Sequence, residues 1–114
     1  MLKDIEKLKY VADIDSSIEE AWTMIEANRH RSVVVVDKGK AVGTLSDGDL
    51  RKAMLARRLL STSVKEVMNT NFIFLTQDKK AEAEKIFQKR DIFLIPIVDD
   101  RMKLVDIWTA PLKL

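Results

Sequence analysis

The sequence predicts an α/β fold of the α+β type, made of two β-α-β-β-α repeats. In each half of the chain a continuous apolar run, at residues 31–37 and 93–99, is followed closely by a second short apolar segment. An amphipathic helical pattern comes before each run. A unit of roughly 60 residues that occurs only twice indicates two small units packed against each other, and not a solenoid. We therefore expect a first repeat in residues 1–61 and a second in residues 62–114, with functional sites in the clefts between them.

The first strand and helix of the first repeat are predicted by alternation and by a cap. Residues 10–14 alternate weakly between apolar and polar side chains, which favours a short strand. Ser16 and Glu19 have the spacing of a capping box, so we expect a helix to start there. Four apolar residues recur at helical spacing: Ile18, Ala21, Trp22 and Ile25. The pattern predicts a helix that buries one face and ends at residues 28–30.

A hairpin and a second helix complete the first repeat. The β-branched run at residues 33–36 is typical of a strand that is covered on both faces. Gly39 supplies the positive φ that a hairpin turn needs, and residues 41–45 are the expected partner strand. Ser46 can cap the following helix, with Asp49 three residues later as in a capping box. That helix has three apolar residues on one face: Leu50, Ala53 and Met54.

The second repeat follows the same plan with two departures. We expect a strand at 72–75, a helix capped by Asp78 with Ala83, Ile86 and Phe87 buried, an apolar strand at 92–98 and a return strand at 103–108. Pro96 cannot donate a ladder hydrogen bond, so this strand should lie at a sheet edge or beside a cleft. Residues 110–114 are too short for the helix that closes the first half, which suggests that the chain was cut or has degenerated there.

Composition excludes several classes of function. At 114 residues the chain has the size of one domain, and a net charge of +2 is too small to indicate a nucleic-acid surface. Without cysteine there is no disulfide, thiolate zinc site or thiol nucleophile. No apolar run is long enough to cross a bilayer, and the charged N-terminus lacks a signal-peptide core. These features favour a cytoplasmic domain that contacts neither membrane nor nucleic acid.

The repeated unit contains a specific motif, Gly43-Thr-Leu-Ser46-Asp-Gly-Asp49-Leu-Arg51-Lys52, with Val36-Asp37 upstream. This unit resembles the cystathionine β-synthase (CBS) domain, and the tandem resembles a CBS pair, or Bateman module, over almost the whole chain. The resemblance implies two units packed about a pseudo-twofold axis, with two clefts that can bind adenine nucleotides, such as AMP, ADP or ATP, or related ligands. It also implies a homodimer, because such pairs commonly dimerise through their helices.

A narrower resemblance concerns the attached enzyme. CBS pairs with this Asp-Gly-Asp motif, starting near the initiator methionine and with Val67-Met68-Asn69 between the repeats, resemble those ahead of bacterial sugar-phosphate nucleotidyltransferases. The motif also occurs in CBS pairs of sugar-phosphate isomerases, but there at the C-terminal end of the chain. Because the repeats begin at Met1 here, we expect a regulatory piece followed by a catalytic domain, a nucleotidyltransferase by this resemblance.

The resemblance places ligand contacts at Ser46 and Asp49, on positions that hold phosphate and ribose hydroxyls in nucleotide-binding CBS repeats. A carboxylate can accept hydrogen bonds from both hydroxyls of a ribose, and a helix N-terminus offers N–H groups to a phosphate. The alternative is a plain helix cap. Asp47 and Asp49 also form the Asp-x-Asp of some metal sites, but no second acidic cluster is evident, and a turn with a cap is the simpler interpretation.

Three cations are further candidates for phosphate binding. His30 and Arg31 precede the apolar strand as a His-Arg pair does in the γ subunit of AMP-activated kinase, and Arg31 suits bidentate contacts. Arg51 could approach the same phosphate from the helix. The alternatives are a solvated loop for the pair and an exposed helical cation for Arg51.

The second repeat departs from the motif. Asp106 replaces the glycine and Leu112 stands where the ribose-binding aspartate would be, so only Thr109 remains. We therefore expect at most one ligand for each pair, centred on Asp49. Four residues could flank an adenine or simply belong to the core: Val33, Val34, Ile95 and Pro96.

These observations predict a regulatory module that binds a nucleotide or nucleotide-like ligand and controls an attached enzyme, without catalysis of its own. His30 is the only histidine, and no nucleophile elbow is present. The alternative function is a structural dimerisation unit that orients the attached enzyme and binds nothing small.

Overall fold

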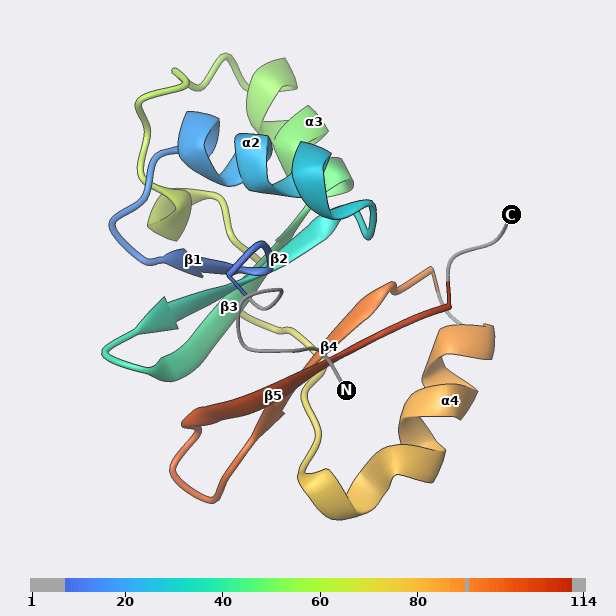
Figure 1. Ribbon diagram of the computed structural model, residues 1–114. Coiled ribbons are helices and arrows are strands. Elements are labelled where there is room, and N and C mark those ends of the chain that lie inside the picture. The colour runs from blue at the N-terminus through green and yellow to red at the C-terminus, as the bar shows by residue number, and fades with distance from the viewer. Residues whose placement is uncertain (1–7, 90, 112–114) are drawn as a thin grey trace.

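A computed structural model describes residues 8–89 and 91–111 and contains two αβ units that face each other through their sheets (Figure 1). The first unit comprises β1 (Val11–Asp13), α2 (Ile18–Asn28), β2 (Ser32–Asp37), β3 (Lys40–Ser46) and α3 (Asp47–Leu55). Its sheet has the order β1-β2-β3, with β1 parallel and β3 antiparallel to β2. The short 3₁₀ helix η1 (Val64–Glu66) follows.

The second unit is smaller. It comprises the 3₁₀ helix η2 (Gln77–Lys79), α4 (Lys80–Lys89), and the antiparallel strands β4 (Leu94–Val98) and β5 (Leu104–Thr109). Helix α4 packs on one side of this two-stranded sheet (Figure 1). Within the described residues, no helix follows β5 in the way that α3 follows β3.

Strand β2 lies at the centre of the molecule and is covered on both faces, as its β-branched sequence predicts. Val33 and Val35 pack under α2 and α3 in one apolar cluster, whereas Val34 belongs to a second cluster with Leu94 and Ile107 of the other unit. All three valines are fully buried. Alternate side chains of one strand therefore form the core of the first repeat and the core between the repeats.

The two repeats are also joined through their hairpins. The N–H of Ala41 donates to the carbonyl of Met102 at 2.9 Å, and the N–H of Leu104 donates to the carbonyl of Gly39 at 2.9 Å. Buried apolar contacts and backbone hydrogen bonds thus hold the repeats together, so the expected shared core is confirmed and the repeats are not separate lobes.

The N-terminal cap of α2 lies one residue later than the sequence predicts. The capping box is formed by Ser17 and Glu20, not by Ser16 and Glu19. Ser17 has the extended backbone that an N-cap needs, with φ −80° and ψ 162°. Ser16 instead belongs to the turn after β1, where its N–H donates to the carbonyl of Asp13 at 2.9 Å.

The expected strand at residues 72–75 is wrong, and Pro96 explains why. Only Leu75 forms a bridge, parallel to Ile97, with the N–H of Leu75 donating to the carbonyl of Pro96 at 3.1 Å. In the first repeat the matching position is Val34, whose N–H donates to the carbonyl of Tyr10 at 2.7 Å. A proline has no N–H, so the second repeat loses this ladder bond and its first strand shrinks to one bridge. Strand β4 is an edge strand of its two-stranded sheet, which is one of the two positions expected for Pro96.

The expected cap at Asp78 is also wrong. Thr76 is the N-cap residue, with φ −97° and ψ 165°, and Asp78 lies inside η2, the 3₁₀ turn that precedes α4. The Asp78 carboxylate accepts a short hydrogen bond from the hydroxyl of Thr76. The pKa of Asp78 is lowered by that bond first and by its own backbone N–H second.

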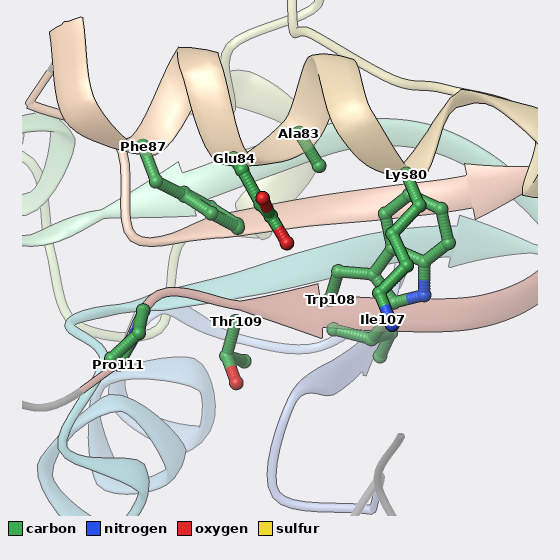
Figure 2. Close-up of a pocket in the computed structure, with 8 residues that line it drawn as sticks. All are labelled: Lys80, Ala83, Glu84, Phe87, Ile107, Trp108, Thr109 and Pro111. Atoms are coloured by element: carbon green, nitrogen blue, oxygen red, sulfur yellow. The ribbon is translucent and has the colours of Figure 1, made fainter.

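A cavity of about 270 Å³ lies between α4 and β5 (Figure 2). It is lined from α4 by Lys80, Ala83, Glu84 and Phe87, and from β5 and the following residues by Ile107, Trp108, Thr109 and Pro111. Leu112, expected at the motif aspartate position, lies outside the described residues.

Candidate functional site

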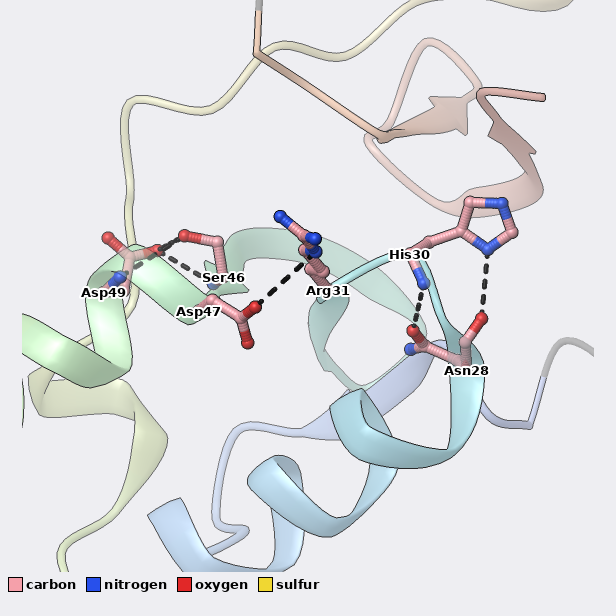
Figure 3. A network of polar contacts seen from close by, with 6 residues as sticks. All are labelled: Asn28, His30, Arg31, Ser46, Asp47 and Asp49. Carbon is pink, nitrogen blue, oxygen red and sulfur yellow. Dashed lines mark hydrogen bonds and ion pairs between the residues drawn. The ribbon is translucent and has the colours of Figure 1, made fainter. Parts of the chain in front are cut away.

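The site predicted around Asp49 forms where β2 begins and β3 ends. Because these strands are antiparallel, the first residue of β2, Ser32, pairs with the last residue of β3, Ser46. The chain on either side is joined by a hydrogen bond from the N–H of Asp47 to the carbonyl of Arg31, at 3.1 Å. The structure thus brings Arg31, Ser46, Asp47 and Asp49 to one end of the first repeat (Figure 3).

Ser46 and Asp49 form a complete capping box at the start of α3. One carboxylate oxygen of Asp49, Oδ2, accepts from the N–H of Ser46 at 2.9 Å and from its hydroxyl at 3.0 Å. The hydroxyl of Ser46 accepts from the N–H of Asp49 at 3.3 Å. Both side chains are half-buried. The expected helix cap is confirmed, whereas the ligand role of these residues stays a prediction.

Arg31 lies between the two repeats. Its Nε is 4.0 Å from Oδ2 of Asp47, and its guanidinium carbon lies 5.8 Å from the centre of the Phe93 ring, which belongs to the second repeat. The backbone of Arg31 has a positive φ of 60°. Its side chain is 69% exposed, and exposed ion pairs contribute little stability. Arg31 is therefore held weakly enough to change partners.

His30 does not lie in a solvated loop, so that alternative is wrong. The ring is buried, with Nδ1 at 2.7 Å from the hydroxyl of Tyr10 and 3.1 Å from the carbonyl of Asn28. Nε2 lies 3.0 Å from the carbonyl of Ala110 in the second repeat. Both ring nitrogens thus face protein partners, and in Figure 3 the ring points away from Arg31. A phosphate contact by His30 would need these bonds to open.

Arg51 and Thr109 occupy different places. A Cβ built on Gly48 would be 3.6 Å from the hydroxyl oxygen of Ser46 and 3.7 Å from Nη2 of Arg51. The exposed Arg51 side chain therefore folds back over the first turn of α3 and comes near the other candidates. Thr109 does not, since it lines the cavity under α4 (Figure 2).

The four residues that could flank an adenine or belong to the core are core residues in this structure. Val33, Val34, Ile95 and Pro96 are fully buried by protein atoms, so they offer no surface to a ligand. Within residues 8–89 and 91–111, no three His, Asp or Glu side chains are grouped closely enough to hold a metal ion.

Asn28 is the neighbour of the candidate site that sequence reasoning missed. It is buried at the end of α2, and its side-chain amide donates to the carbonyls of Lys9 at 2.9 Å and Ser32 at 2.8 Å. Its side-chain oxygen accepts from the N–H of His30 at 2.9 Å. Asn28 thereby fixes the loop that presents Arg31. The sequence contained a signal for the burial of Asn28, because Asn28 lies three residues after Ile25 and so continues the spacing of the buried face of α2.

Comparison with known proteins decides the family. The family model of the CBS domain matches residues 2–56 and 64–110. The chain belongs to the CBS domain family. Since the match occurs twice, the chain is a tandem CBS pair, a regulatory type of module, and the predicted tandem is confirmed.

Solved structures show the same fold. The CBS pair matches AcuB, an acetoin utilization protein by its name, from Vibrio cholerae, with a TM-score of 0.77 and 29% identity, over 88% of this chain and 76% of that one. It matches the CBS pair of protein MJ0100, solved in complex with 5′-methylthioadenosine and S-adenosyl-L-methionine, with a TM-score of 0.71 and 28% identity over 88% of this chain and 83% of that one. The expected fold class is confirmed.

Among characterised relatives, the pair is 38% identical over 91 residues to the arabinose 5-phosphate isomerase GutQ of Salmonella typhi. The match covers 78% of this chain but only 28% of GutQ. This relative is an isomerase, so the expected resemblance to nucleotidyltransferases is not what this comparison shows. Within the described residues, no helix is long and apolar enough to span a membrane.

Proposed function

We propose that this CBS pair binds one adenine nucleotide or related adenosine compound at the junction of Arg31, Ser46 and Asp49, and thereby regulates an attached catalytic domain. The observation that supports the proposal most is the convergence of a weakly held guanidinium with the capped N-terminus of α3, beside Phe93 of the other repeat.

Each group has a chemical role in this proposal. Arg31, with Arg51 over the first turn of α3, supplies positive charge for a phosphate, and the helix N-terminus adds N–H donors. Asp49 accepts hydrogen bonds from ribose hydroxyls, as the family motif implies. MJ0100, which shares 28% identity with this chain, was solved with two adenosine derivatives, which makes adenosine compounds the first ligands to test. His30 and Thr109 are secondary candidates, since His30 is fully engaged and Thr109 lies apart.

Regulation would follow from Arg31 changing partners. A bound phosphate competes with Asp47 for the guanidinium, and Arg31 also contacts Phe93 across the repeat boundary. A ligand that prefers one arrangement of the two repeats shifts the population toward it, by no more than its difference in affinity for the two arrangements.

The attached enzyme is proposed in two forms. The Asp-Gly-Asp motif is compatible with a sugar-phosphate nucleotidyltransferase and with a sugar-phosphate isomerase, and the 38% identity to GutQ over 91 residues favours the isomerase. A cytoplasmic homodimer, with repeats divided at residues 61 and 62, belongs to the same proposal. We propose no contact with nucleic acid.

A ligand-free scaffold is the second candidate function, and one observation favours it. Ser46 and Asp49 already satisfy each other in the capping box, so they have a structural role without any ligand. In this alternative the CBS pair dimerises and orients the attached enzyme.

Isothermal titration calorimetry separates the two functions. We expect the protein to bind AMP, ADP, ATP or S-adenosyl-L-methionine, and Arg31→Ala to weaken this binding while leaving the helix cap intact. Lys52→Ala is the matched control, since Lys52 is also an exposed cation but lies in the last turn of α3. Absence of heat with all four compounds would leave the scaffold function as the better account.

A further inference from the structure

Two backbone donors at the start of α3 are already engaged by the protein. The N–H of Asp47 donates to the carbonyl of Arg31 at 3.1 Å, and the N–H of Asp49 donates to the hydroxyl of Ser46 at 3.3 Å. Both belong to the set of N–H groups that a helix N-terminus offers to a phosphate. The attraction for a phosphate at this end of the repeat therefore comes mainly from the guanidinium of Arg31, with that of Arg51 nearby.

A carboxylate faces the guanidinium of Arg31. Oδ2 of Asp47 lies 4.0 Å from Nε of Arg31, and a dashed line in Figure 3 marks this pair. The side chain of Asp47 is 32% exposed, against 69% for Arg31, and the bond from its own N–H fixes its place in the backbone. Arg31 can therefore turn toward a ligand, whereas the charge of Asp47 stays at the edge of the site. The carboxylate of Asp49 is held differently, since its Oδ2 accepts two hydrogen bonds from Ser46.

The charge of Asp47 acts at short range on any group that binds Arg31. A phosphate oxygen at about 2.8 Å from Nε of Arg31 would lie no more than about 7 Å from Oδ2 of Asp47. At that separation and the dielectric constant of water, each pair of unit charges changes an equilibrium constant about threefold. The Debye length at 0.1 M salt is about 10 Å, so salt screens this interaction only in part. The interaction is repulsive for a phosphate and attractive for a cation.

We propose that Asp47 determines which adenosine compounds the site accepts, by disfavouring negative charge at the 5′ position of the ribose and favouring a neutral or cationic group there. The inference rests on the function proposed above, which places the ribose hydroxyls at Asp49 and a 5′ phosphate at Arg31. A phosphate must replace Asp47 as the partner of Arg31 and then remains close to the displaced carboxylate. A neutral 5′ group leaves the ion pair intact, and a cationic group gains a carboxylate nearby.

The simpler role for Asp47 is that of an acid in the first turn of a helix, where a carboxylate interacts favourably with the helix dipole. Glu19 has such a position in α2, away from the proposed site. A dipole interaction changes stability but not the preference for ligand charge, so Glu19→Gln is a matched control for Asp47→Asn. The cap of α3 is retained in Asp47→Asn, because Ser46 and Asp49 form it.

Calorimetric titration at about 10 mM salt, where the Debye length is about 30 Å, tests the proposal with three probes. AMP, 5′-methylthioadenosine and S-adenosyl-L-methionine carry a phosphate, a neutral thioether and a sulfonium at the 5′ position. In Asp47→Asn we expect AMP to bind about five- to tenfold more tightly, because its phosphate carries nearly two charges. Binding of 5′-methylthioadenosine should change less than about twofold, and S-adenosyl-L-methionine should bind about two- to threefold more weakly.

The controls separate charge from other effects of the substitution. Asp47→Glu should keep the affinities of the unaltered chain, and Glu19→Gln should change none of them. At about 1 M salt, where the Debye length is about 3 Å, the effects of Asp47→Asn should nearly vanish.

The opposite directions expected for AMP and S-adenosyl-L-methionine are the decisive result. Changes of equal size and sign for both compounds, or no change for either, overturn the role of Asp47 and leave the proposed function standing. If the unaltered chain binds none of the three probes, the proposed function fails and this inference fails with it.

Discussion

The two capping boxes of the first repeat offer a matched pair of substitutions. In α3, the hydroxyl of Ser46 accepts from the N–H of Asp49 at 3.3 Å and donates to its carboxylate at 3.0 Å. In α2, the hydroxyl of Ser17 accepts from the N–H of Glu20 at 3.1 Å and donates to its carboxylate at 3.1 Å. The geometry is nearly the same, but only Ser46 lies at the proposed ligand site.

We expect Ser46→Ala and Ser17→Ala to lower the free energy of unfolding by similar amounts, about 1 kcal/mol each, the usual cost of losing an N-cap hydroxyl. For a chain of this size that corresponds to a fall in Tm of about 4 °C. Urea unfolding followed by circular dichroism gives both values. If neither substitution changes stability, the capping argument is wrong.

The two variants should differ in ligand affinity. Ser46→Ala removes the ligand contact that we propose for this hydroxyl and the bonds that orient Asp49, so we expect about tenfold weaker nucleotide binding, equivalent to a loss of about 1.4 kcal/mol. Ser17→Ala should bind as the unaltered chain does. Calorimetry at a temperature where both variants are folded makes the comparison. Equal losses in both variants would refute the proposed contact, because affinity would then follow stability alone.

Three further predictions concern stability. Gly43→Ala should cost about 1–3 kcal/mol in urea unfolding, because an added Cβ would lie 2.7 Å from Sδ of Met68 and 3.1 Å from the carbonyl oxygen of Asn69. Tyr10→Phe should cost about 0.5–1.5 kcal/mol, because it removes the hydroxyl that lies 2.7 Å from Nδ1 of His30 and donates to the carbonyl of Asn28, while Nδ1 keeps that carbonyl at 3.1 Å. The pKa of Asp99 is lowered by the N–H of Arg101 first and that of Lys103 second, so the carboxylate stabilises the fold above about pH 4. This contribution is lost as pH falls through the lowered pKa, and Asp99→Asn should therefore reduce the acid dependence of Tm between pH 5 and pH 2; an unchanged dependence contradicts the assignment.

Local signals were sufficient for the centre of the fold. The β-branched run of β2 and the glycine of the hairpin predicted two strands with their turn, and antiparallel pairing alone brings Arg31 beside Ser46. In the turn, Lys38 and Gly39 both have positive φ, at 52° and 84°, which is the geometry that such a hairpin requires. The part of the candidate site that one hairpin brings together, Arg31 and Ser46, could therefore be predicted from the sequence.

Contacts between distant segments were not accessible in that way. His30 is buried because Tyr10 and Ala110 both reach it, and nothing in the local pattern of residues 28–31 indicates either partner. The sequence predicted only one of the two structural consequences of Pro96. Its missing N–H predicted an edge, but the loss of the neighbouring strand follows from which side of β4 that N–H would have faced.

The structure also changes the argument for a single ligand site. Gly43 is needed because the linker between the repeats runs along β3: the N–H of Asn69 donates to the carbonyl of Thr44 at 2.8 Å, and the reverse bond is 3.1 Å. At the matching position of β5, Asp106 is accommodated, and its buried carboxylate accepts from the N–H of Ile107 at 2.8 Å. The glycine of the motif thus serves the close approach of the linker. Its replacement in the second repeat is no sign of a degraded ligand site, so the expectation of one ligand for each pair rests on Leu112 alone.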